Sequence, residues 1–114
     1  MGDVSLVFVK VAEISEVPAG KMKKITLEGK DVLIVNLNGT YYAIGNKCTH
    51  RGGDLSKGTL DGTQITCPRH KAKFDITSGK VISGPKLPIV RPTINDEPLY
   101  DVKVEGNDIF IKTS

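Results

Sequence analysis

The chain has 114 residues, of which 39% are hydrophobic and 25% charged, and it contains no Trp. This length fits one domain with a single core, and the composition is that of a folded globular protein, which excludes a disordered chain. The formal net charge of +3 is only a mild basic excess, so we expect no nucleic-acid partner.

Charged residues interrupt the apolar residues near the N-terminus, at Asp3, Lys10 and Glu13. No segment there reaches the length of a signal-peptide core, and no apolar stretch anywhere approaches the length that spans a bilayer. We therefore expect a soluble, cytoplasmic protein with no membrane partner.

The sequence predicts mainly strands over residues 4–44. Residues 4–11, VSLVFVKV, are β-branched and aromatic and predict a strand, and the next segment has room for one helical turn before Pro18 and Gly20. Turn signals at Glu28-Gly29 and at Asn38-Gly39 then separate three further strands. These strands are predicted at 22–27, 31–37 and 40–44.

Shorter elements follow in the second part. Glycines interrupt residues 48–70, so we expect the first half of that window to be loop, followed by short strands in 63–67 and 72–76. A turn at Ser78-Gly79 leads into KVIS, and the chain ends in a hairpin that turns at Gly106-Asn107-Asp108. Many short strands with almost no helical period predict an antiparallel β sandwich or barrel, from which the glycine-rich window projects as a pair of loops.

All the cysteines and histidines of the chain lie in this window, as Cys48, His50, Cys67 and His70. They form the motifs C-x-H and C-P-x-H, separated by residues 51–66. A disulfide between the cysteines would leave the two histidines unexplained, so a metal site is the better interpretation.

Two kinds of metal site use two Cys and two His. A tetrahedral zinc site is one, but zinc fingers usually place the two cysteines together and the two histidines together. Here each motif offers one of each, which suits a two-iron cluster whose one iron takes both thiolates and whose other iron takes both imidazoles. The spacing favours the cluster, and zinc stays the alternative.

This pair of motifs closely resembles that of the Rieske iron–sulfur family, and most of all the small soluble Rieske-type ferredoxins, including archaeal and oxygenase-associated ones. The resemblance implies an all-β Rieske domain over residues 1–114, with cluster-binding loops at about 46–84. It implies one [2Fe-2S] cluster per chain. The implied ligands are Cys48, His50, Cys67 and His70.

The resemblance also bears on the reduction potential. Respiratory Rieske proteins carry a Ser and a Tyr that donate hydrogen bonds to cluster sulfurs, where this chain has Ala72 and Phe74. Such donors stabilise the more negative reduced state, so their loss lowers the potential. We expect a value near the bottom of the Rieske range of about −150 to +300 mV.

The implied function is that of a one-electron carrier between a reductase and a terminal enzyme such as an oxygenase. The chain has no third histidine for a mononuclear iron, so we expect no catalytic residues and no enzyme activity of its own. One alternative is a small subunit of a larger, nitrite-reductase-like enzyme. A zinc-stabilised structural module is another.

Basic residues surround the predicted ligands and suggest a face that docks an acidic surface of a redox partner. Merely solvated charges are an equal alternative. The residues in question are Lys47, Arg51, Arg69, Lys71 and Lys73. Residues 83–88 are the candidate covering loop of the cluster, and 89–97 form either a partner-specific loop or a tolerated insertion.

Overall fold

The structure, a computed structural model, describes residues 8–47, 53–68, 71–83 and 96–112. Within these ranges every paired strand is antiparallel, and the only helices are two single turns of 3₁₀ helix, which confirms the expected all-β class. The elements are β1 (Phe8–Glu13), η2 (Ile14–Glu16), β2 (Met22–Leu27), β3 (Lys30–Leu37), β4 (Thr40–Gly45), η3 (Leu55–Lys57), β5 (Thr59–Asp61), β6 (Gln64–Thr66), β7 (Lys73–Asp75), β8 (Val81–Ser83), β9 (Leu99–Tyr100), β10 (Val102–Glu105) and β11 (Asp108–Lys112).

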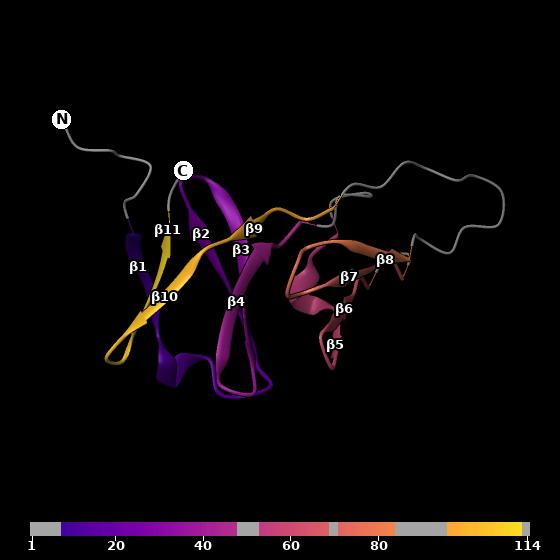
Figure 1. Cartoon of the computed structure of the whole chain (residues 1–114). Coiled ribbons are helices and arrows are strands. Elements are labelled where there is room, and N and C mark those ends of the chain that lie inside the picture. The colour runs from indigo at the N-terminus through magenta and orange to yellow at the C-terminus, as the bar shows by residue number, and fades with distance from the viewer. Residues whose placement is uncertain (1–7, 48–52, 69–70, 84–95, 113–114) are drawn as a thin grey trace, which may run out of the picture.

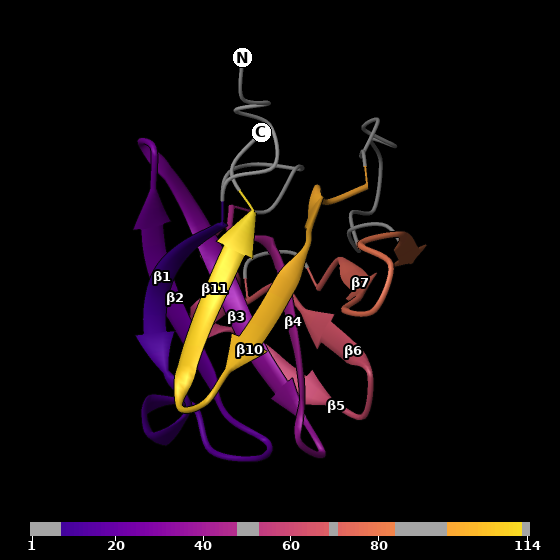
Figure 2. The ribbon, with the colours of Figure 1, turned by 60° about the vertical axis from the view of Figure 1, so that its left-hand side comes forward.

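The described strands form three sheets. Their strand orders are β1-β11-β10, β2-β3-β4-β9 and β5-β6-β7-β8. Figure 1 shows the second of these between the other two, and the turned view of Figure 2 places β10 and β11 in front of β3 and β4. The sheet of β5 to β8 comes from the chain between β4 and β9, so it is a small subdomain inserted into a larger β scaffold.

Strand β3 explains why the central sheet is covered on both faces. Its segment Val32–Leu33–Ile34–Val35 is fully buried, and side chains of successive residues point to opposite faces of a sheet. Val32 and Ile34 pack with Ile109 and Ile111 of the first sheet. Leu33 and Val35 pack instead against the inserted subdomain. One continuous apolar run therefore builds two cores.

The tight turns form where they are predicted. Both central residues of each early hairpin have positive φ, with 53° at Glu28 and 78° at Gly29, and 54° at Asn38 and 91° at Gly39. This is the type I′ geometry that matches the twist of the strands. The final hairpin turns at Gly106, whose φ is 60°. These turns fix the register of β2 to β4 and of β10 to β11.

Other boundaries differ from the expected ones. The first strand runs on to Glu13, the single helical turn is η2, and residues 4–7 of the predicted strand lie outside the described residues. The prediction that the first half of the glycine-rich window is loop is wrong for Leu55–Lys57, which forms η3, and for Thr59–Asp61, which forms β5. β5 exists because residues 59–61 pair with β6 across a turn at Gly62, whose φ is 61°.

Candidate metal centre

Cys67 is the one predicted ligand that lies among the described residues; Cys48, His50 and His70 lie outside them. Cys67 follows β6, is only 2% exposed, and its thiol is free. Its N–H donates to the Ala72 carbonyl at 2.8 Å, and its carbonyl accepts from the Lys71 N–H at 3.2 Å. These bonds close the second motif into a tight loop between β6 and β7.

The first motif begins at a second closed base. Lys47 and Asp54 form an isolated antiparallel bridge, and the Leu55 N–H donates to the Asn46 carbonyl at 2.8 Å. Cys48 is therefore the next residue in the chain after Lys47 of this bridge. The structure thus closes both motif-bearing loops at their bases.

A close backbone approach joins the two bases. A Cβ atom on Gly58 would lie 2.1 Å from the carbonyl oxygen of Thr66, the residue before Cys67. Only glycine permits this approach, because every other residue carries a Cβ. Leu55 of η3 lies in the same buried core as Cys67. The two loops are therefore supported by one packed unit.

The floor of the site is apolar. The core around Cys67 combines side chains of the central sheet with those of the inserted subdomain: Leu33, Val35, Ile44, Leu55, Ile65, Ala72, Phe74 and Ile76. Ala72 and Phe74, which the family resemblance leads us to expect in place of a Ser and a Tyr, are both fully buried. Neither side chain can donate a hydrogen bond to a cluster sulfur.

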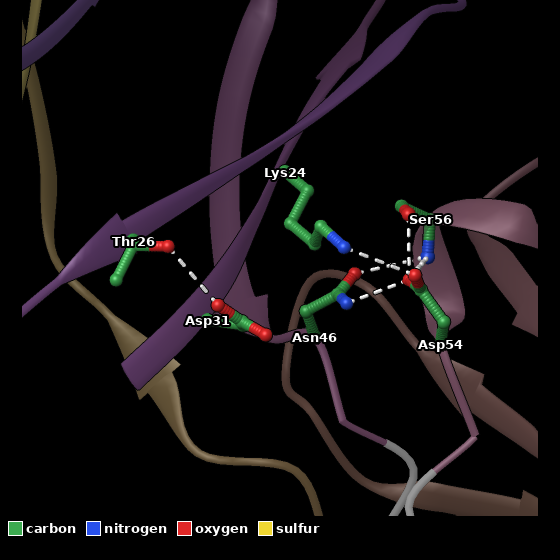
Figure 3. Close-up of polar contacts among 6 residues, drawn as sticks. All are labelled: Lys24, Thr26, Asp31, Asn46, Asp54 and Ser56. Carbon is green, nitrogen blue, oxygen red and sulfur yellow. Dashed lines mark hydrogen bonds and ion pairs between the residues drawn. The ribbon is translucent and has the colours of Figure 1, made fainter. Parts of the chain in front are cut away.

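A polar network lies at the base of the first loop (Figure 3). The Asp54 carboxylate accepts from Asn46 Nδ2 at 2.7 Å, from the Ser56 N–H at 3.0 Å and from Lys24 Nζ at 3.1 Å. Partial burial raises the pKa of Asp54, but the hydrogen bonds from Ser56, Asn46 and Lys24 outweigh burial and hold that pKa well below its usual value. Asp54 is therefore a permanent anion at neutral pH.

Sequence reasoning missed this network. A local signal existed for one part of it, because Asp is a favoured N-cap and Asp54 caps η3 through Ser56. No local signal links Asp54 to Lys24, since the two lie 30 positions apart.

Residues 96–98 tie the inserted subdomain to the scaffold. Asp96 Oδ1 accepts from the Val81 N–H at 2.8 Å, and the Glu97 N–H donates to the Gly79 carbonyl at 2.7 Å. The Pro98 carbonyl then accepts from the Gly45 N–H of β4 at 3.0 Å. Asp96 and Glu97 therefore have a structural role. They are the last two residues of segment 89–97, for which the sequence allows either a partner-specific loop or a tolerated insertion. Residues 89–95 of that segment lie outside the described residues.

These features fit the two-iron cluster. Cys67 supplies a buried thiol without a disulfide partner, and the sequence supplies a second Cys and two His on loops with neighbouring bases. Two thiolates and two imidazoles are the donor set of a Rieske centre. The described residues by themselves contain no group of three metal-ligating side chains, as expected when three of the four predicted ligands lie outside them.

Comparisons with known proteins agree with this fit. The family model of the Rieske [2Fe-2S] domain matches residues 7–94. The ferredoxin component of the naphthalene 1,2-dioxygenase system of Pseudomonas aeruginosa is 31% identical over 94% of this chain and 96% of its own. The biphenyl dioxygenase ferredoxin subunit of Pseudomonas sp. strain KKS102 is 33% identical over 96% of this chain and 94% of its own.

Solved structures show the same likeness. The ferredoxin of carbazole 1,9a-dioxygenase from Nocardioides aromaticivorans IC177 superposes with a TM-score of 0.82, at 26% identity, over 95% of this chain and 99% of its own. No helix among the described residues has the length and apolar character needed to cross a bilayer. The chain therefore belongs to the Rieske [2Fe-2S] domain family, with one [2Fe-2S] cluster per chain, and is an electron carrier of the ferredoxin kind.

Proposed function

We propose that this ferredoxin carries single electrons, at low potential and in the cytoplasm, from a reductase to a terminal oxygenase. The observation that carries the proposal is its end-to-end similarity to ferredoxin components of dioxygenase systems, which span almost the same length. A solved structure with a TM-score of 0.81 and 25% identity is a complex of reduced oxygenase and oxidized ferredoxin in carbazole 1,9a-dioxygenase. We infer one domain over residues 1–114, with cluster-binding loops at about 46–84 and no catalytic site of its own.

We assign the four ligands as Cys48, His50, Cys67 and His70. In a Rieske centre the two thiolates bind one iron and the two imidazoles bind the other, and the bound cluster supplies one-electron redox chemistry. Cys67 presents its thiolate from a buried, apolar setting, and the closed loop from Cys67 to Ala72 restrains its backbone. The lack of hydroxyl donors at Ala72 and Phe74 supports a low potential.

Exposed lysines flank the ligand positions. Lys47 directly precedes Cys48 and Lys71 directly follows His70, and both side chains are exposed. Lys71 has φ of 66°, an uncommon conformation for a residue other than glycine, asparagine or aspartate. We infer that these charges guide an acidic surface of the partner toward the ligand loops.

Metal analysis and ligand variants test the assignment. Wild-type protein purified without oxygen should contain two irons and two acid-labile sulfides per chain and no zinc. Cys67→Ser and His70→Ala should each abolish the visible absorption and electron-spin signal of the reduced cluster, whereas the control Lys71→Gln should keep both. Retention of the full signal in His70→Ala would contradict the assignment.

Electron transfer tests the carrier role. Stopped-flow mixing should show that the host's reductase reduces the cluster and that its terminal oxygenase reoxidises it, at rates that fall as salt rises. Lys71→Gln should slow these steps at low salt, and Lys10→Gln on the far sheet should not. A rate independent of salt would remove the docking role, and no transfer to any oxygenase component would remove the proposed function.

A further inference from the structure

Asp54 occupies the position where the first ligand loop is closed. Its backbone forms an antiparallel bridge with that of Lys47, the residue directly before the predicted ligand Cys48 in the chain. The carboxylate side chain is 26% exposed, so water screens it less than an ordinary surface charge. It is an acidic group fixed beside the base of a redox site.

Three parts of the chain converge on this carboxylate (Figure 3). Asn46, at the end of β4, donates its side-chain amide, and Ser56 of η3 donates both its N–H and its hydroxyl, the latter at 2.5 Å. Asn46 Oδ1 accepts in turn from the same Ser56 N–H at 2.9 Å. The network thus holds together the residues that enter and leave the loop of Cys48 and His50.

The third contact is an ion pair. Lys24 lies on β2, an edge strand of the central sheet, and its Nζ is 3.1 Å from Asp54 Oδ2. The Lys24 side chain is 41% exposed and belongs to no ligand loop. Its charge can therefore be removed without disturbing the hydrogen bonds that Asn46 and Ser56 make with Asp54.

Charges fixed near a redox centre shift its reduction potential. Reduction makes the cluster more negative, so a nearby carboxylate opposes it and a nearby ammonium favours it. Asp54 and Lys24 act in opposite directions, and their contact makes each partly cancel the other.

We propose that Asp54 is a positioning residue that holds the base of the first ligand loop, and that the balance between its charge and that of Lys24 sets part of the cluster's reduction potential. This inference rests on the proposed ligation by Cys48 and His50.

The test is the midpoint potential of holoprotein variants, measured by redox titration at low ionic strength. Asp54→Asn removes the negative charge and should raise the potential, whereas Lys24→Gln removes the positive charge and should lower it. The double variant should return toward the wild-type value. Glu105→Gln, beside Lys103 in the far sheet, removes a paired carboxylate distant from the inserted subdomain and should leave the potential unchanged.

The rate of cluster loss to an iron chelator reports the positioning role separately. Asp54→Asn should speed this loss, because an amide in place of the carboxylate cannot accept all the donors now directed at both oxygens. Lys24→Gln should change it little. Shifts of potential in the same direction in both variants, or no shift in Lys24→Gln, would overturn the charge-balance role.

Iron and sulfide content of each preparation separates this inference from the proposed ligation. A wild-type chain lacking two irons and two sulfides would overturn the ligation and the inference together. A wild-type chain with a full cluster and Asp54→Asn with unchanged potential and unchanged cluster loss would overturn the inference alone.

Discussion

Among the glycines whose surroundings the structure describes, Gly58 is the one at which an added Cβ would make the shortest contact. Gly58 ends η3 with φ of −83°, a conformation that alanine adopts without strain. The penalty is therefore steric: the new Cβ would meet the Thr66 carbonyl oxygen at 2.1 Å and the Leu55 carbonyl oxygen at 3.2 Å. Both are backbone atoms, so relief requires η3 to separate from β6.

The size of the effect follows from this geometry. Overpacking a close-packed region costs about 1–3 kcal/mol, and a backbone obstacle places Gly58→Ala at the upper end, about 3 kcal/mol. At about 4 °C per kcal/mol for a domain of this size, the midpoint of thermal unfolding should fall by about 12 °C. Cluster loss to a chelator should also accelerate, because Thr66 directly precedes Cys67.

A matched variant separates the steric cost from the cost of backbone conformation. Gly62 has φ of 61°, and no atom lies within 4 Å of the place that an added Cβ would take, so Gly62→Ala carries only the left-handed penalty of about 1 kcal/mol. Urea unfolding of both variants, followed by circular dichroism, gives the comparison. The proposed coupling of the two loops would be refuted by two results together: a free energy of unfolding for Gly58→Ala at least as high as that of Gly62→Ala, and a rate of cluster loss equal to that of wild type.

Three further predictions concern the site and its floor. Ala72→Ser and Phe74→Tyr each supply a hydroxyl donor and should raise the midpoint potential in a redox titration; an unchanged or lower value in the double variant would count against the account of the low potential. Phe74→Ala should cost about 3–5 kcal/mol in urea unfolding, since the ring is fully buried, and a loss below about 1 kcal/mol would show that this core is loosely packed. The folded-state pKa of Asp54 lies below its ordinary 3.8, so the ionised carboxylate stabilises the fold above that pH. The difference in unfolding free energy between wild type and Asp54→Asn should therefore be constant at neutral pH and shrink as the pH falls toward the folded-state pKa. A difference that grows in acid would contradict the network.

Local chemistry explains which elements the sequence predicts well. The hairpins at Glu28-Gly29 and Asn38-Gly39 depend on residues that accept positive φ, and such residues act within the turn itself. The predicted ligands also depend on local sequence, because two short motifs contain all the thiol and imidazole side chains of the chain. The predicted short strand at 63–67 is also found, although it ends one residue before Cys67.

Elements that depend on distant partners are predicted less well. The sequence predicts a single hairpin at the end of the chain, but Leu99–Tyr100 pairs with β4 and Val102–Glu105 pairs with β11, so the chain changes sheets at Asp101. η3 and β5 likewise need the Asp54 cap and the pairing with β6. No pattern of neighbouring residues reveals these contacts.

The pairing of β4 with β9 has a consequence for how this architecture can change. Ala43 faces Tyr100 and Ile44 faces Leu99, and the Gly45 N–H bonds to the Pro98 carbonyl, so the chain departs from the scaffold and rejoins it at adjacent positions. A segment whose two ends are neighbours can be lengthened, shortened or exchanged while the frame keeps its register. The segment from Asn46 to Glu97 can therefore be exchanged while the strands keep their register, provided that its replacement also covers Leu33, Val35 and Ile44, which now pack against it.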